Sequence, residues 1–315
     1  MDNIVVTAQP SAKKNQNKLI KDIITNKYIY IMLIPVFLYY IIFHYAPMFG
    51  AIIAFKEYRP GLGIFGSPWV GLRYFKDFFT DMYFMRLIKN TLLISFYEIV
   101  FGFPAPIILA LMLNEVKKDS FKKTMQTITY LPHFVSLVVI CGMVKEFTAS
   151  NGLINDIVAI LGGERATMLL KPEYFKTIFV STGIWQQLGW GSILYLSAMS
   201  GIDSEQYEAA RIDGAGRWKQ MINVTLPGVY PTIVIMLILR IGSVMSVGFE
   251  KVILLYNPST YSTADVISSY VYRKGLQEFN YSYSSAIGIF NAVINFGLVI
   301  GSNWISRKLN DTSLW

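Results

Sequence analysis

Six long apolar stretches constrain this chain more than any other feature of its sequence. The first, Tyr28–Phe49, holds no Lys, Arg, Asp or Glu. A helix needs about 20 mostly apolar residues to cross the hydrocarbon core of a bilayer. The predicted membrane-spanning helices cover Tyr28–Phe49, Leu87–Leu113, Met125–Phe147, Phe175–Met199, Val229–Phe249 and Ala286–Ile305. One such stretch fits a buried core helix, but six indicate an all-α integral membrane protein.

The composition supports this fold class and excludes others. Hydrophobic residues make up 53% of the 315 residues and charged residues only 15%, against about 25% charged in a typical soluble domain. The stretches lack the alternation of period two that a membrane β-barrel requires. The single cysteine, Cys141, excludes a disulfide framework and a cysteine-based zinc cluster.

The distribution of Lys and Arg predicts an orientation. Basic side chains gather in the leader, in the connections 114–124 and 200–228, and in the tail. Cytoplasmic connections carry such an excess, so both termini are predicted to be cytoplasmic. We expect a cytoplasmic leader over 1–27, a six-helix transmembrane permease domain over 28–305 and a cytoplasmic tail over 306–315. The excess of basic residues behind the net charge of +8 is then an orientation signal for the membrane helices. For this reason we do not expect nucleic-acid binding.

Several kinds of chemistry are missing from the sequence. It has no G-x-x-x-x-G-K-[ST] loop for ATP and no G-x-S-x-G nucleophile elbow. The two histidines, His44 and His133, exclude an H-E-x-x-H metal site. We therefore expect no enzyme activity, no metal site and no cofactor in this chain. Uphill transport would draw its energy from a partner or an ion gradient.

The connection 201–228 has a pattern of its own. Asp203 or Ser204 is predicted to cap a short helix over Glu205–Ile212, and Gly214-Ala215-Gly216 permits a sharp turn. A second short helix, about Arg217–Asn223, is predicted to stop at Pro227. On the residues alone, the two helices fit equally a knob that docks on another protein and an amphipathic segment at the membrane interface.

A family resemblance decides between these alternatives. Glu208-Ala209-Ala210-x-x-x-Gly214, followed after nine residues by Val224-x-Leu226-Pro227, resembles the EAA loop of ABC-importer permeases. Val224 replaces the usual isoleucine, which is a conservative change. Upstream, Tyr45–Gly50, Ala54–Tyr58 and Gly66–Gly71 look like the complex-sugar or polysaccharide branch of these permeases.

The resemblance implies a type I ABC-importer permease fold whose EAA loop, about 201–228, is a cytoplasmic coupling helix. It implies that ATP and Mg²⁺ bind to a separate ATPase, and that this chain works in a bacterial cell membrane. The implied partners are a second homologous permease, two ATPase subunits and an extracellular solute-binding protein. The implied solute is an oligosaccharide. The coupling positions are Glu208, Ala209, Ala210, Gly214, Val224, Leu226 and Pro227.

Polar side chains inside the predicted spans are candidates for the substrate path, because such groups usually face a bundle interior or an aqueous cavity. Glu98 and Arg240 either pair with each other, which we favour, or contact substrate. Amides hydrogen-bond hydroxyl groups and aromatic rings stack on sugars, although such residues also hold helices together. The further candidates are Trp185, Gln186, Gln187, Trp190, Asn291 and Asn295.

Two expectations concern the spans themselves. Pro104 and Pro106 are predicted to kink or break the second span, and His133 is predicted to be a packed core histidine.

Two functional alternatives stay open at this point. One is an ion-coupled secondary transporter, although no paired repeat supports it; the other is an ABC permease for a solute other than a sugar.

Overall fold

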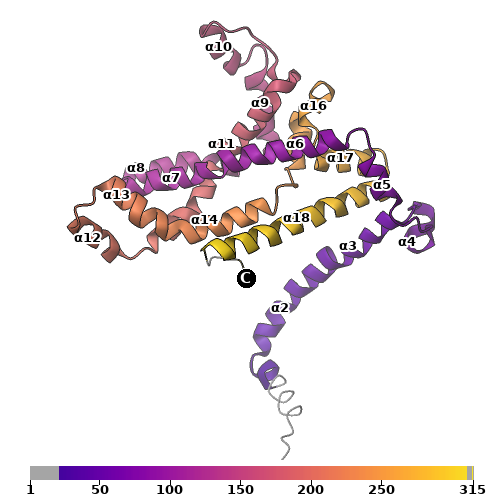
Figure 1. The fold of residues 1–315 in the computed structure, drawn as a ribbon, viewed down its shortest axis with the longest axis horizontal. Helices are drawn as coiled ribbons and strands as arrows, with labels where there is room; N and C mark the ends of the chain where they lie inside the picture. Colours follow the sequence, from indigo (N-terminus) through magenta and orange to yellow (C-terminus); the bar gives the residue numbers. More distant parts are fainter. Residues whose placement is uncertain (1–20, 311–313, 315) are drawn as a thin grey trace, which may run out of the picture. The chain divides into compact units, whose positions relative to one another are not determined.

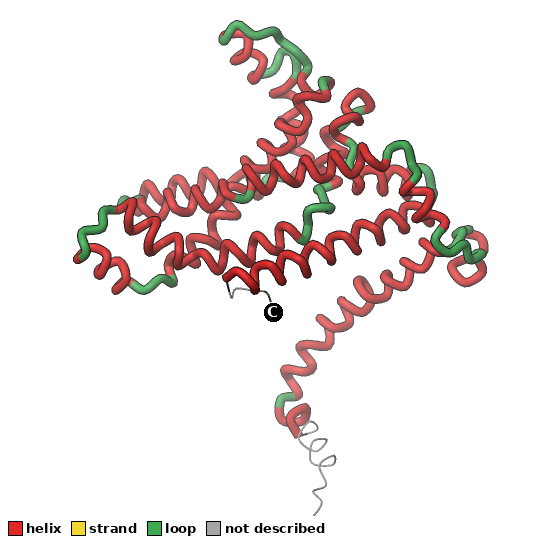
Figure 2. The backbone as a smooth tube through the Cα atoms, in the orientation of Figure 1, coloured by secondary structure: helices red, strands yellow, loops and turns green. Residues whose placement is uncertain are grey.

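The computed structural model describes residues 21–310 and Leu314. Residues 1–20 of the predicted leader, and 311–313 and 315 of the predicted tail, lie outside the described residues. The described residues divide into two units, one holding 21–53 with 58–68 and the other 54–57 with 69–310 and Leu314. The described residues are almost entirely helix and connecting loop (Figure 2), apart from an isolated bridge between Lys56 and Trp69.

The smaller unit is built around the first predicted span. It contains α2 (Lys27–Tyr40), the π-helical turn η1 (Ile41–Tyr45), α3 (Ala46–Met48) and the start of the 3₁₀ helix η2 (Phe49–Phe55). The short elements η3 (Pro60–Leu62) and α4 (Gly63–Gly66) follow. None of the residues of α2 is buried, although nearly all are apolar. A helix that is apolar all round is suited to lipid.

The larger unit is a bundle of long helices with short ones at their ends (Figure 1). Helix α11 packs along α7, and α14 packs along α18. The elements in chain order are α5 (Arg73–Phe79), α6 (Phe84–Tyr97), η4 (Glu98–Gly102), α7 (Pro104–Glu115), α8 (Asp119–Tyr130), η5 (Leu131–Phe134), α9 (Leu137–Thr148), α10 (Leu153–Ile160), η6 (Met168–Leu170), α11 (Pro172–Ser200), α12 (Ser204–Ile212), α13 (Arg217–Gln220), η7 (Met221–Thr225), α14 (Leu226–Ile241), α15 (Phe249–Leu255), η8 (Pro258–Thr260), α16 (Tyr261–Ala264), α17 (Ile267–Tyr272), η9 (Arg273–Gln277) and α18 (Tyr281–Asn310).

The buried side chains of this unit form three apolar clusters, which include Phe179, Phe78 and Val229 respectively. The first lies mainly between α9, α11 and α15, the second around α5, α17 and α18, and the third between α7, α11 and α14. Many other large apolar side chains are exposed. In lipid, an exposed apolar side chain carries no penalty, so small cores and an apolar exterior suit a membrane bundle.

Five helical stretches among the described residues are long and apolar enough to cross a membrane. Helix α11, with 29 residues, is long enough but is not among them, because polar side chains such as Gln186 and Gln187 interrupt it. Helix α11 packs against α7, α8, α14 and α16. Gln186 is buried in this packing, whereas Gln187 is exposed. The five apolar stretches are Lys27–Phe55, Phe84–Glu115, Leu137–Ile160, Arg217–Ile241 and Tyr281–Lys308.

The predicted continuous helix over Met125–Phe147 is wrong. Helix α8 ends at Tyr130, a 3₁₀ turn covers Leu131–Phe134, and α9 begins at Leu137. Pro132 lacks the N–H that a continuing α-helix needs. The new helix is capped by Ser136, whose side chain accepts a hydrogen bond from the Val139 N–H (3.4 Å).

Of the kink or break predicted at Pro104 and Pro106, the break does not occur, because the helix widens into the π turn η4 and continues. The Phe103 N–H donates to the carbonyl oxygen of Glu98 five residues earlier (2.8 Å). This wider turn accommodates Pro104, which lacks an N–H and crowds the carbonyl four residues before it. Helices α6 and α7 therefore form one continuous helical stretch from Phe84 to Glu115.

The prediction that Pro227 stops a helix is wrong for the same reason. The π turn η7 (Met221–Thr225) precedes Pro227, so α13, η7 and α14 run on from Arg217 to Ile241. The predicted fifth span, Val229–Phe249, consequently begins earlier and ends earlier. It stops before Gly242, where a turn leads into the short helix α15.

Candidate functional site

Two regions of the larger unit hold the residues singled out in the sequence. The first is the loop 201–228, at the end of the bundle that carries α12 and α13 (Figure 1). Helix α12 begins after Asp203, as predicted, and the carboxylate of Asp203 accepts a hydrogen bond from the Glu205 N–H (3.0 Å). The cap satisfies a backbone donor that the first turn of a helix leaves free.

The end of α12 gives a physical reason for the spacing of the motif. The Ala215 N–H donates to Ala210 O (2.8 Å), and the Gly214 N–H donates to Arg211 O (3.0 Å). These two bonds form a Schellman motif, which places a left-handed residue directly after the helix. Gly214 occupies that position with φ +76°. The sharp turn predicted at Gly214 is confirmed.

The motif residues divide between surface and interior. Glu208, Ala209 and Gly214 are exposed and Ala210 is half-buried, so this side of α12 is open to a partner. Two large apolar side chains of the same loop are also exposed, Ile212 by 86% and Trp218 by 74%. Exposed apolar surface of this kind marks a protein or membrane contact. At the far end of the motif, Val224 is buried, whereas Leu226 and Pro227 are exposed.

Side chains fix α12 to the start of α14. The Tyr207 hydroxyl and Thr225 Oγ1 are 2.9 Å apart. Gly228 makes room for Ile202, because a Cβ at that glycine would lie 2.6 Å from Ile202 Cδ1. The loop is therefore an ordered extension of α14 rather than a free linker.

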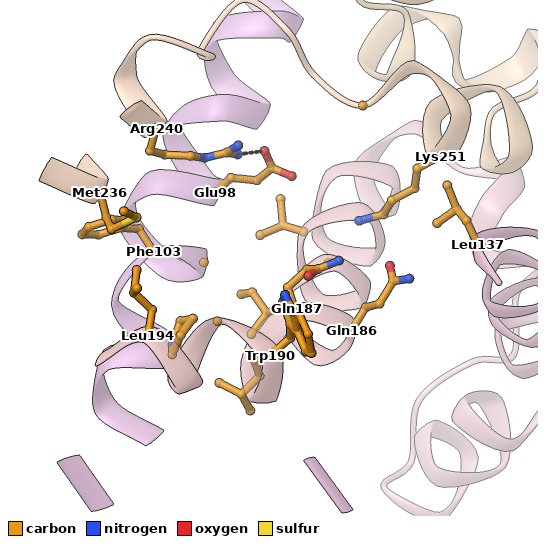
Figure 3. Close-up of a pocket in the computed structure, with 18 of the residues that line it drawn as sticks. Glu98, Phe103, Leu137, Gln186, Gln187, Trp190, Leu194, Met236, Arg240 and Lys251 are labelled. Atoms are coloured by element: carbon orange, nitrogen blue, oxygen red, sulfur yellow. Dashed lines mark hydrogen bonds and ion pairs between the residues drawn. The ribbon is translucent and has the colours of Figure 1, made fainter. Parts of the chain in front are cut away.

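The second region is an open cavity of about 650 Å³ in the middle of the bundle (Figure 3). Its walls come from η4, α7, α9, α11, α14 and α15. The predicted path residues that line it are Glu98, Gln186, Gln187, Trp190 and Arg240.

An ion pair crosses one side of the cavity. Arg240, in the last turn of α14, bonds the carboxylate of Glu98 on η4, so the pairing that the sequence favoured does form. Their side chains are 35% and 22% exposed, which means that the pair faces the cavity rather than solid core. Each charge lowers the cost of holding the other away from bulk water.

The other side of the cavity carries amides and aromatic rings from α11. Gln187 Oε1 accepts a hydrogen bond from His133 Nδ1 (3.1 Å), and the His133 ring stacks on Trp190 with centroids 4.4 Å apart and planes 2° apart. The prediction of a packed core histidine is therefore wrong: His133 is half-buried and supports the two cavity residues. The turn at Pro132 brings it there.

Three predicted path residues do not line the cavity. Trp185 is 46% exposed outside it. Asn295 holds α18 to the turn after α14, since its Oδ1 accepts from the Met245 N–H (3.0 Å) and its Nδ2 donates to Ser246 Oγ (2.8 Å). Asn291, one turn earlier on α18, has a buried Oδ1 without a partner among the described residues. We do not assign these three to the substrate path.

The sequence did not point to Lys251, which lines the same cavity from α15. This residue is only 8% exposed, and its Nζ lies 4.0 Å from the centre of the Phe179 ring. Burial lowers the pKa of Lys251 to about 8, with the Glu98 carboxylate acting in the opposite direction. No sequence signal marks it, because it lies in a predicted connection and reaches the cavity only through tertiary packing.

Two acidic residues that the sequence did not single out, the buried Asp265 and the half-buried Asp81, order the connection 250–285. Asp265 is fully buried and is paired with Arg86 (3.2 Å) and Arg273 (2.7 Å). Asp81 accepts hydrogen bonds from the hydroxyls of Tyr270 and Tyr283, both at 2.6 Å. Burial alone would raise the pKa of Asp81, but these bonds outweigh it and lower that pKa.

The sequence of this chain matches a known protein family. Residues 102–311 match the family of binding-protein-dependent transport system inner membrane components. The chain belongs to this family. It is accordingly a multi-pass membrane component of a transport system and not an enzyme, and its all-α fold is that of an ABC permease. Membership removes the ion-coupled secondary transporter that the residues alone had left open.

Similar proteins match along nearly the full chain. Protein LplB of Bacillus subtilis (strain 168) is 45% identical over 291 residues, 92% of each chain. The polygalacturonan/rhamnogalacturonan transport system permease protein YteP of the same organism is 41% identical over 96% of this chain and 95% of its own. A crystal structure of a bacterial ABC transporter involved in the import of the acidic polysaccharide alginate has a chain with TM-score 0.86 and 44% identity, covering 93% of this chain and 99% of that chain.

Proposed function

We propose that this chain is the permease subunit of an ATP-driven importer of oligosaccharides and forms half of the translocation path. The observation that carries the proposal is the physical link between the two regions. The exposed helix α12 is fixed to the start of α14, and the last turn of α14 holds Arg240 in the wall of the cavity. A displacement of α12 would therefore reach the cavity through one continuous helix.

The coupling positions then have separate roles. Glu208, Ala209 and Ala210 form the face that meets an ATPase subunit, where alanines allow close approach and the carboxylate can pair with a basic group. Gly214 ends the helix with a turn that adds no bulk. Val224, Leu226 and Pro227 belong to the junction with α14, which carries the motion onward.

The partners proposed are two ATPase subunits, a second homologous permease and an extracellular solute-binding protein. ATP and Mg²⁺ are proposed to bind in the ATPase subunits, since this sequence has no phosphate-binding loop. The basic leader and connections favour cytoplasmic termini, which puts α12 on the side where ATP is available.

An oligosaccharide is favoured as the solute by the cavity and by the relatives. Amides such as Gln186 and Gln187 suit sugar hydroxyls, and the Trp190 ring suits the apolar face of a sugar. YteP is named for polygalacturonan and rhamnogalacturonan transport, and the similar solved transporter for alginate import. A permease for a non-sugar solute is the alternative.

The test is uptake by the reconstituted transporter. The chain is purified with its second permease and ATPase subunits, placed in lipid vesicles and supplied with the binding protein. We expect labelled oligosaccharide to accumulate only with ATP hydrolysis. Hydrolysis that responds to a peptide or another solute, with no oligosaccharide uptake, would establish the alternative.

A further inference from the structure

The cavity contains a buried cation, Lys251, that has no anionic partner among the residues that the structure describes. Lys251 lines the cavity and is 8% exposed. Within the described part of the chain, no hydrogen bond or ion pair reaches its Nζ. Figure 3 shows the side chain pointing from α15 into the cavity, toward the side that holds Glu98 and Gln187.

The acidic groups nearby do not fill this role. The Glu98 carboxylate is bonded by Arg240. Glu250 also lines the cavity, but it is exposed, and neighbouring residues of a helix do not face each other. The Cys141 thiol is free and buried near Lys251, and because an ordinary thiol ionises only above neutral pH, with a pKa of about 8.5, it supplies no negative charge there.

A glycine keeps space open for the ammonium group. A Cβ at Gly183 of α11 would lie 2.8 Å from Lys251 Nζ and 4.0 Å from Glu98 Oε1. The ammonium therefore rests against bare backbone, with the Phe179 ring 4.0 Å from it. The contact with the ring offsets part of the cost of burying the charge, but not all of it, since buried charges are normally paired.

We propose that Lys251 binds a carboxylate of an acidic oligosaccharide as it passes through the cavity. This inference rests on the proposed function and narrows its substrate class to sugars that carry uronic acids. A carboxylate supplied by the ligand completes the pairing that the protein lacks, and such charge-assisted hydrogen bonds are among the strong ones. At neutral pH the ammonium is mostly charged, as its pKa of about 8 requires.

The experiment compares two probes in vesicles that hold the complete transporter. One probe is trigalacturonate, and the other is the same trisaccharide with its carboxyl groups reduced to alcohols. Lys251→Met is expected to lower uptake of trigalacturonate at least about tenfold, the lower range for a hydrogen bond to a charged group. The loss is expected to be confined to the charged probe, so the ratio of trigalacturonate uptake to uptake of the reduced trisaccharide should fall by about the same factor.

A second variant keeps the charge but moves it. Gly183→Ala would push the ammonium aside, and the flexible end of a lysine can yield without unfolding the helix. We expect a smaller loss that is again confined to trigalacturonate. The control is Lys145→Met, which removes an exposed lysine on α9 outside the cavity and should leave both probes unaffected.

Each result decides the inference. Equal trigalacturonate uptake by Lys251→Met and wild type overturns it, as does an equal loss for both probes, which would indicate a structural role. If the wild-type transporter takes up the reduced trisaccharide but not trigalacturonate, the inference about Lys251 is overturned, whereas the proposed function still holds. If the wild-type transporter takes up neither probe, both the inference about Lys251 and the proposed function are overturned.

Discussion

In the loop 201–228, the important residues lie within one short stretch of sequence, whereas Glu98 and Arg240 in the cavity are separated by 142 residues. The cap at Asp203 and the turn at Gly214 are local hydrogen-bond structures that a few residues specify. The cavity exists only after α11, α14 and α15 have packed together. The loop is thus determined by local backbone chemistry and the cavity by tertiary packing, and substitutions should affect the two in different ways.

The largest effect is expected in the loop. Gly214→Asp should leave folding and membrane insertion intact, because aspartate tolerates left-handed φ better than most residues and no atom lies within 4 Å of a Cβ there. We expect substrate-stimulated ATP hydrolysis by the complex to be abolished, since a charged side chain then stands on the proposed ATPase contact. Hydrolysis is measured with loaded binding protein present.

The matched control for this substitution is Gly162→Asp. Gly162 also has a positive φ, +83°, and open space around it, but it follows α10 rather than α12. It should keep normal stimulated hydrolysis. If Gly214→Asp also hydrolyses ATP normally, the coupling role of α12 is wrong.

An intermediate effect is expected at the ion pair in the cavity. Arg240→Gln leaves the Glu98 carboxylate unpaired, and we expect it to lower the free energy of unfolding by about 1–3 kcal/mol, less than for a fully buried pair. Adding Glu98→Gln removes the second charge and should restore most of the loss. The thermal midpoint of the purified complex measures both.

This double variant also separates the two roles considered for the pair. A structural pair predicts that stability and oligosaccharide uptake recover together. Recovered stability with uptake still lost would instead assign the pair to substrate contact.

The smallest effect is expected at the aromatic wall. Trp190→Ala removes the ring that His133 supports, and we expect KM for oligosaccharide uptake to rise by about three- to tenfold, equivalent to about 0.5–1.5 kcal/mol for an aromatic contact. Trp185→Ala, on the same helix but outside the cavity, should leave KM unchanged. Equal changes in KM for the two variants would remove Trp190 from the path.

The same contrast explains how much the sequence could predict. Apolar length predicted the first, second and last membrane helices, and the capping and turn residues at Asp203 and Gly214 predicted α12 and its end, because these signals are local. The sequence also favoured the pairing of Glu98 with Arg240, since charges inside a membrane bundle need partners. The helix end predicted at Pro227 was wrong, because that proline is accommodated by a π turn that depends on the surrounding helix.

Other cavity residues had no local signal at all. Lys251 lies in a predicted connection, and only the packing of α15 on α9 and α11 brings it to the cavity. His133 was misjudged because the turn at Pro132 places its ring beside Trp190. Asn295 was predicted to be a path residue, but its side chain is hydrogen-bonded to Met245 and Ser246 in the turn after α14 and does not line the cavity.

The π turn η4 also has a consequence for how sequences of related permeases are aligned. A π turn holds one more residue than an α turn, and each residue rotates an α-helix by about 100°. That extra residue sets the angle between the buried side of α6 and the stripe Ile107, Ala110 and Leu113 on α7. A relative that lacks one residue between positions 98 and 104 would present a different face of α7 to α11. A gap placed there in an alignment therefore marks a rotated helix and not a shortened loop.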